Sequence, residues 1–266
     1  MAPPNRPAPR LLDVIASTPV TTNMLRLTLG GPGLDGFPAG QAGGYVKLRL
    51  PQADGKIAVR TYTIRAQRGG ENGDASGQQI DVDFALHAKS DDEADGPATE
   101  WATRTHASNG QGDQIEVGGP GPAKPLPPGH DFYLLVGDMT ALPAISVNLE
   151  MLPDDARGLA IIEVLSADDK QDLACPAGVE IRWIVNPHPG RDVVLPAAVQ
   201  VTPWPDGNVY AWCASEFSTM QALRRYLREE RGLGPAQLYI SSYWKSGLTE
   251  EAHKDIKRED LEATAG

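Results

Sequence analysis

The stretch 118–129, with the sequence GGPGPAKPLPPG, limits what the chain can fold into more than any other stretch. It holds five prolines and four glycines. Proline has no amide donor and breaks a helix from inside, so we expect neither a regular helix nor a central strand there. The residue patterns before and after it differ. We therefore predict two domains, 1–126 and 127–266.

Residues 1–126 have the pattern of an antiparallel β-barrel. Short runs that alternate apolar and polar residues are separated by Gly- and Pro-rich turns, for example at 30–33 and 69–74. Such runs are typical of small all-β domains. We expect strands at 11–15, 23–29, 45–50, 58–65, 80–86 and 113–117.

Residues 127–266 change to alternating strands and helices. Continuous apolar runs are typical of strands buried on both faces, and the segments between them have helical spacing. This order predicts a three-layer α/β domain whose ligands lie beyond the carboxyl ends of parallel strands. We expect strands at 132–136, 158–165, 181–185 and 209–213, and helices at 143–152, 217–231 and in the tail from 250.

Charge and composition narrow the range of functions. The net charge of −11 argues against binding to nucleic acids or anionic membranes. No apolar run reaches the roughly 18 residues that span a bilayer, and the first residues lack the apolar core of a secretion signal. We therefore expect a cytoplasmic protein that does not insert into membranes. We also expect a monomer, although no sequence feature bears on the oligomeric state. Cys175 and Cys213 form no Cys-x-x-Cys pair, so we expect metal only as a substrate.

The run Arg60-Thr61-Tyr62-Thr63-Ile64-Arg65 lies on the predicted strand 58–65. Taken alone, it fits an amphipathic strand with Arg60, Tyr62 and Ile64 on one face. It also resembles the Arg-x-Tyr-Thr-x-Arg flavin pattern of the siderophore-interacting proteins, which are flavin-dependent ferric-siderophore reductases of the ferredoxin-NADP reductase superfamily. Between residues 10 and about 253, further blocks resemble the same family in the same order: 83–87, 96–102, 137–145, 212–216 and 243–247.

This resemblance implies an FAD site on the barrel. Arg60 would face the pyrophosphate, Tyr62 would pack against the flavin ring, and Thr63 would lie near N5 through its hydroxyl or its backbone. Thr61 completes the motif. His87 either contacts the cofactor or ends a strand.

A second part of the FAD site is implied by the block 96–102. A helix that starts after Gly96 would present unpaired amides to a phosphate. Ala98 and Thr99 are the residues implied there, and Trp101 is included although packing suits it better. An acidic insertion at 89–95 departs from the family spacing.

On the nicotinamide side, the resemblance implies contacts from Gly137, Asp138, Ala141 and Glu216. Asp138 and Thr140, together with Thr63 on the barrel, are the predicted catalytic residues, because the family places them where nicotinamide meets flavin. Thr140 alternatively only caps the following helix. NADPH is favoured over NADH by resemblance, although the run 166–170 holds both a possible ribose acceptor and a cation.

An anionic ferric siderophore would need cations near the flavin. Four residues are candidates for substrate binding, and each alternatively is only a solvated charge. Lys47 and Lys245 correspond to cationic positions of the family, with Lys245 in place of its usual Arg. Arg49 shares the face of Lys47 on strand 45–50, and Lys124 lies in the stretch between the domains.

These features favour an NAD(P)H-dependent ferric-siderophore reductase. Hydride would pass to FAD, and single electrons would then reach Fe(III) and release Fe(II). Two alternatives stay open: a flavin or ferredoxin-type oxidoreductase with another acceptor, and a siderophore-binding protein without redox activity. The second is permitted by departures from the family pattern at Met139, at Ser215 and in the acidic insertion.

Overall fold

The computed structural model describes residues 8–52, 54–69, 77–86, 96–110 and 112–264. The chain divides into two compact units, Met1–Lys124 and Pro125–Gly266. His87 and the acidic insertion 89–95 lie outside the described residues, so their predicted roles are not addressed by the structure.

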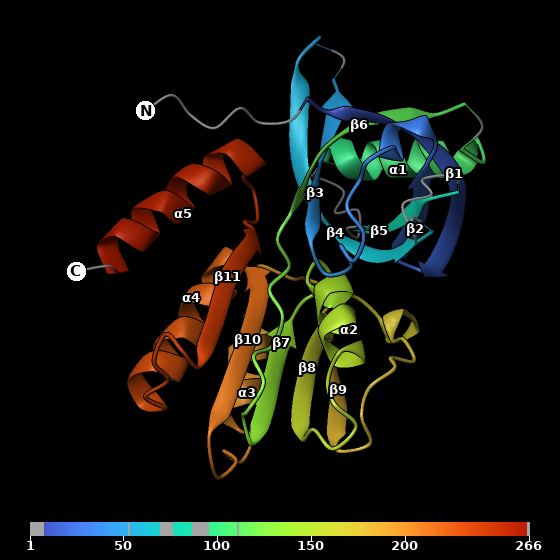
Figure 1. The fold of residues 1–266 in the computed structure, drawn as a ribbon. Coiled ribbons are helices and arrows are strands. Elements are labelled where there is room, and N and C mark those ends of the chain that lie inside the picture. Colours follow the sequence, from blue (N-terminus) through green and yellow to red (C-terminus); the bar gives the residue numbers. More distant parts are fainter. Residues whose placement is uncertain (1–7, 53, 70–76, 87–95, 111, 265–266) are drawn as a thin grey trace, which may run out of the picture. The chain divides into compact units, whose positions relative to one another are not determined.

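The first unit is a closed antiparallel barrel with strand order β1-β2-β5-β4-β3-β6 (Figure 1). Buried and more exposed side chains alternate along the strands, and the buried ones form the core of the barrel. In β3, for example, Val46, Leu48 and Leu50 are buried whereas their neighbours are only partly covered. Helix α1 adds Ala98 and Trp101 to the same core. The elements are β1 (Arg10–Thr21), β2 (Met24–Gly30), η1 (Pro32–Leu34), β3 (Tyr45–Pro51), β4 (Ile57–Arg68), β5 (Gln79–Ala85), α1 (Pro97–Ala107) and β6 (Gln114–Gly121).

The second unit is a five-stranded parallel sheet with strand order β11-β10-β7-β8-β9. Helices α3 and α4 pack on one face and α2 on the other (Figure 1). Strands β7, β8 and β10 are apolar along most of their length because both faces are covered. The elements are β7 (Phe132–Gly137), α2 (Leu142–Glu150), β8 (Gly158–Val164), η3 (Ala167–Asp169), β9 (Val179–Val185), α3 (Val194–Gln200), β10 (Val209–Glu216), α4 (Phe217–Arg225), η4 (Tyr226–Glu230), β11 (Leu238–Trp244) and α5 (Glu250–Thr264).

The predicted fold class, a β-barrel followed by a three-layer α/β domain, is confirmed. The strand pattern differs from expectation at β6, which continues through Pro120 to Gly121. There it pairs with β3, whereas its pairing with β1 ends at Val117. Pro120 is tolerated because that part of the strand has a partner on one side, where a missing amide costs least.

The helix predicted at 217–231 also differs in detail. It is α-helical to Arg225 and continues as the wider π-turn η4. Helix α3 was not predicted, because its residues 194–200 are few and include Pro196. No described helix is long and apolar enough to cross a membrane. Cys175 and Cys213 are unpaired thiols.

Candidate functional site

The flavin motif lies on β4, with its side chains divided between two faces. The register places Val46 opposite Tyr62 and Leu48 opposite Arg60, so Arg60 and Tyr62 project to the core side. Thr61 and Thr63 project to the other side. The Tyr62 ring packs against Phe84 at 4.4 Å between ring centroids and remains half-buried. The structure therefore brings Arg60 and Tyr62 together and separates them from Thr61 and Thr63.

Helix α1 begins without a side-chain cap. Gly96 occupies the N-cap with an extended backbone, Pro97 follows, and no side chain of the described residues accepts from the first turn. The amides at the start of a helix have no partner within it and favour an anion. The side chains of Ala98 and Thr99 are buried, so the groups that they could offer to a phosphate are their backbone amides. Trp101 packs in the barrel core, with its ring centroid 6.0 Å from that of Phe84, as the packing alternative predicted.

A cation at Arg60, an aromatic ring at Tyr62 and an uncapped helix start fit the needs of FAD. The first offers charge to the pyrophosphate, the second a surface for the ring, and the third amide donors for a phosphate. All three belong to the first unit. The described part of this unit therefore holds residues of the types that an FAD site requires.

In the second unit, Asp138 links the ends of strands β7, β10 and β11 through hydrogen bonds. It follows β7 and is buried. Its Oδ1 accepts from the amide and the hydroxyl of Thr140, at 2.9 and 2.5 Å. Its Oδ2 accepts from the amide of Glu216 in β10, at 2.9 Å, and from Trp244 Nε1 in β11, at 2.8 Å. Four donors around two oxygens suit an ionised carboxylate, although burial raises the pKa of Asp138.

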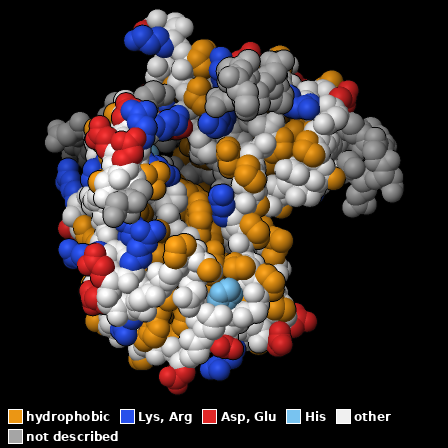
Figure 2. Space-filling model, turned by 60° about the vertical axis from the view of Figure 1, so that its left-hand side comes forward, with side chains coloured by type: hydrophobic (Ala, Val, Ile, Leu, Met, Phe, Trp, Pro, Cys, Tyr) orange, Lys and Arg blue, Asp and Glu red, His pale blue; other side chains and the backbone are white. Residues whose placement is uncertain are grey.

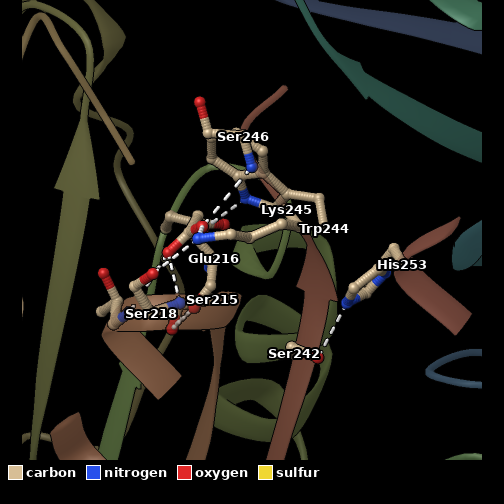
Figure 3. Close-up of polar contacts among 10 residues, drawn as sticks. Ser215, Glu216, Ser218, Ser242, Trp244, Lys245, Ser246 and His253 are labelled. Carbon is tan, nitrogen blue, oxygen red and sulfur yellow. Dashed lines mark hydrogen bonds and ion pairs between the residues drawn. The ribbon is translucent and has the colours of Figure 1, made fainter. Parts of the chain in front are cut away.

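Glu216 caps helix α4 and pairs with Lys245 (Figure 3). Its Oε2 accepts from the amides of Ser218 and Thr219, at 2.5 and 3.2 Å. Its Oε1 lies 3.1 Å from Lys245 Nζ, which also donates to Ser218 Oγ at 2.6 Å. Asp138 and Glu216 are thus both buried and hydrogen-bonded within the chain, and the contacts of their carboxylates hold the ends of β7, β10 and β11 together.

The other residues at the ends of β7 and β10 and at the start of α2 pack closely. At Gly137 a Cβ atom would lie 2.8 Å from both Ala141 Cβ and Ala214 O, so the glycine is needed for the approach of β10 and α2. Ala141 and Met139 are buried. Ser215, where the family has Gly, has a negative φ and its side chain is buried. A serine therefore fits at this position without the left-handed backbone conformation that would require glycine.

Sequence reasoning missed Glu163, which is buried in β8. The pKa of Glu163 is raised to about 8, mainly by burial and next by the charge of Asp138. A hydrogen bond from the Asn186 side chain acts in the opposite direction and lowers this pKa. The charges of Glu216 and Asp192 raise it further. A glutamate inside an otherwise apolar strand run was the available signal.

The pKa of Glu163 predicts a pH-dependent stability. The folded chain keeps its proton from the ordinary pKa of 4.5 up to about 8, whereas the unfolded chain loses it, so rising pH destabilises the fold across this window. We expect Glu163→Gln to stabilise the protein progressively from pH 5 to pH 8, by at most about 1.4 kcal/mol per pH unit. Urea unfolding at several pH values checks this. Glu180→Gln is the control, since Glu180 is exposed and paired with Arg182 two residues along the same strand, β9. A constant difference between Glu163→Gln and the native chain would contradict the assignment.

Helix α5 is held to the sheet by polar contacts. His253 Nε2 lies 2.8 Å from Ser242 Oγ of β11, with both side chains buried (Figure 3). Lys257 Nζ donates to Ser241 Oγ and to the Ser242 carbonyl, at 2.7 and 2.9 Å. Burial lowers the pKa of both His253 and Lys257. These contacts were not predicted because they join residues on different elements.

The four predicted substrate cations have different surroundings. Lys245 is paired with Glu216, and Arg49 pairs with Glu116 at 2.9 Å. Lys124 has a further interaction within the chain. Lys47 forms no ion pair with another residue that the structure describes. On the face drawn in Figure 2, Lys and Arg side chains are spread among acidic and hydrophobic ones.

The fold defines the general class first. A barrel followed by this parallel sheet is also the fold of the ferredoxin-NADP+ reductase from Plasmodium falciparum, with a TM-score of 0.59 at 11% identity over 88% of this chain and 96% of that one. At that identity the likeness concerns the fold alone. The chain thus has the two-part fold of this reductase, a barrel followed by a parallel α/β sheet.

The chain belongs to the siderophore-interacting protein family. Residues 53–124 match the siderophore-interacting FAD-binding domain, and residues 130–247 match the siderophore-interacting protein domain. FAD is accordingly its cofactor. The ferric vibriobactin reductase ViuB of Vibrio cholerae is 33% identical over 93% of each chain. The structure of the siderophore-interacting protein SipS from Aeromonas hydrophila superimposes with a TM-score of 0.79 at 33% identity, covering 96% of this chain and 98% of that one.

Proposed function

We propose that this protein is an NAD(P)H-dependent ferric-siderophore reductase of the cytosol. The observation that carries the proposal is the joining, in one chain, of the family's FAD-binding barrel to a parallel sheet with the strand order of a nucleotide-binding domain. Bound FAD supplies the exchange between a two-electron hydride donor and a one-electron acceptor. The acceptor is Fe(III) in an anionic chelate. Reduction favours release because Fe(II) is held less tightly by hard oxygen ligands.

The residues of the chain bind, orient and neutralise in this scheme. Arg60 offsets the charge of the pyrophosphate, and Tyr62 presents its ring to the flavin. Asp138 and Glu216 hold the ends of β7, β10 and β11 in fixed relative positions, so that a nicotinamide meets a rigid surface there. Lys47 attracts the anionic substrate. No side chain is required to form a covalent bond with the substrate.

We propose NADPH as the preferred donor. Of the two acids in the run 166–170, Asp169 is buried and its Oδ2 accepts from the Ser166 amide at 3.0 Å, so it does not serve as a ribose acceptor. Asp168 and Lys170 are exposed. Lys170 is therefore available to a 2′-phosphate, in competition with the charge of Asp168. The ratio of the rates of flavin reduction by NADPH and by NADH tests this preference.

The function is tested by anaerobic visible spectra of the purified holoprotein, recorded before NADPH, after NADPH and after a ferric siderophore. We expect the flavin absorbance to bleach with NADPH and to return with the chelate. A flavin that bleaches and stays reduced would replace the chelate with another acceptor. A protein without flavin that binds the chelate would leave only the non-catalytic alternative.

Reversing the charge at Lys47 should separate the two half-reactions. We expect Lys47→Glu to lower kcat/KM for an anionic ferric siderophore by about threefold to tenfold, with the effect shrinking as salt is added. Bleaching of the flavin by NADPH should be unchanged. Lys56→Glu is the control, since Lys56 lies in an exposed turn and pairs with Asp54. An equal loss in both half-reactions would refute the assignment of Lys47 to substrate binding.

A further inference from the structure

The loop that follows β9 reaches residues at the far side of the sheet. β9 is an edge strand, and β8 and β7 separate it from β10. Nevertheless, a Cβ atom at position 190 would lie 3.0 Å from Ser246 Cβ, 3.3 Å from Trp244 Cη2 and 3.4 Å from Glu216 Cγ. Glu216 ends β10 and Trp244 ends β11. The segment 186–192, which we name the strap, therefore passes over the carboxyl ends of β8 and β7.

One buried side chain fastens the strap. Asn186 Nδ2 donates to the carbonyl of Asp192 at 3.0 Å, and Asn186 Oδ1 accepts from the amide of His188 at 3.0 Å. The backbone amide of Asn186 donates to the Val164 carbonyl at 2.8 Å, which ties the strap to the end of β8. The same side chain donates a hydrogen bond to Glu163. The side chain of Asn186 thus links the two ends of the strap, beside the buried carboxyl group of Glu163.

Gly190 lets the strap close. Its φ of +84° lies in the region that favours glycine, and the three contacts of its missing Cβ are tighter than, or at the limit of, ordinary van der Waals contact. A side chain at this position would both strain the backbone and push the strap away from Ser246 and Trp244. The packed position of the strap therefore depends on a single residue.

The strap covers the place where a ligand of this fold would lie. In an open parallel sheet, ligands bind beyond the carboxyl ends of the strands where the strand order reverses. The order β11-β10-β7-β8-β9 reverses between β7 and β10. We propose that the strap is a lid, which opens to admit the nicotinamide nucleotide to the ends of β7 and β10 and closes again on the bound nucleotide. This inference rests on the proposed function, because it takes that nucleotide as the ligand.

Gly190→Ala tests the lid, with Gly129→Ala as a matched control. Gly129 has a φ of +86° and open space around its Cβ position, so its substitution adds the same backbone strain without a contact. In the FAD-loaded protein we expect Gly190→Ala to speed amide hydrogen exchange at His188, Arg191 and Asp192 roughly tenfold. Flavin bleaching at low NADPH concentration should become roughly threefold faster or more, since the lid opens more readily. In the native protein, NADP+ should slow exchange in the strap, and Gly129→Ala should match the native protein.

Asn186→Asp is a second variant that acts at the fastening point. It keeps the acceptor for His188 but removes the donor to the Asp192 carbonyl, so it should change exchange and bleaching in the same direction as Gly190→Ala. If the native chain and the variants have equal exchange rates and equal bleaching rates, the lid proposal is wrong, whereas the proposed function is unaffected. A holoprotein that neither NADPH nor NADH bleaches would overturn the proposed function, and the lid with it.

Discussion

Replacing Asp138 with alanine is expected to lower the free energy of unfolding by about 3–5 kcal/mol, because several buried donors lose their acceptor at once. The amide of Glu216 and the indole Nε1 of Trp244 both donate to Asp138 Oδ2, and neither has a replacement acceptor provided by alanine. Each buried donor left without an acceptor costs about 1–3 kcal/mol. Urea unfolding monitored by tryptophan fluorescence measures the loss.

The same substitution should slow the reduction of bound FAD by NADPH by about 100-fold, because small displacements of positioning groups carry such a cost. Asp138 fixes the ends of β10 and β11 relative to β7, and those ends carry Glu216, Trp244 and Lys245. Stopped-flow measurement of flavin bleaching gives the rate. Chemical reduction of the flavin and its reoxidation by a ferric chelate should be unchanged, since neither uses the nucleotide.

Two further variants sharpen this prediction. Asp138→Asn has nearly the same shape, but its amide nitrogen would face either Thr140 or the donors of Glu216 and Trp244, so it should be almost as damaging as alanine. Asp131→Ala is the control at the opposite end of β7, where Asp131 accepts from the amide of Asn208 at 2.8 Å in an exposed position. If Asp138→Ala unfolds like Asp131→Ala and is reduced within twofold of the native rate, the positioning role is wrong.

The fold could be predicted because its signals are local. Alternation with a period of two identifies β3, and continuous apolar runs identify β7 and β8. The flavin motif on β4 could also be found, since its six residues are contiguous. The division of Arg60 and Tyr62 from Thr61 and Thr63 follows from the same alternation.

The geometry of the second unit could not be predicted in the same way, because its contacts join residues far apart in sequence. Trp244 of β11 donates to Asp138 at the end of β7, with β10 between them, and Gly190, in the loop after edge strand β9, packs close to Glu216. Such contacts require the strand order, which no local pattern provides. Lys245 illustrates the consequence: its charge is visible in the sequence, but its pairing with buried Glu216 is not.

Replacing Arg60 with alanine is expected to weaken FAD binding by about 10-fold to 100-fold, which is the usual cost of losing a charge-assisted contact to a phosphate. Arg60 is half-buried on β4, on the same face as Tyr62 and the core residues Val46 and Leu48. Arg60→Lys should recover only part of the loss, because lysine keeps the charge without the planar fork of donors. The affinity is measured by quenching of FAD fluorescence on binding to the apoprotein.

Arg49→Ala is the control that shows whether a loss of FAD affinity is specific to Arg60 or follows from removing any positive charge. Arg49 projects from the opposite face of neighbouring strand β3, and its ion pair with Glu116 is partly exposed, so we expect FAD affinity to stay within twofold of the native value. If Arg60→Ala keeps native affinity, the pyrophosphate depends on the uncapped start of α1 instead, and the cationic position of the motif has no role in binding. If Arg60→Ala and Arg49→Ala both lose FAD, net charge rather than the position of Arg60 controls binding. Loss in Arg60→Ala alone assigns the pyrophosphate to that side chain.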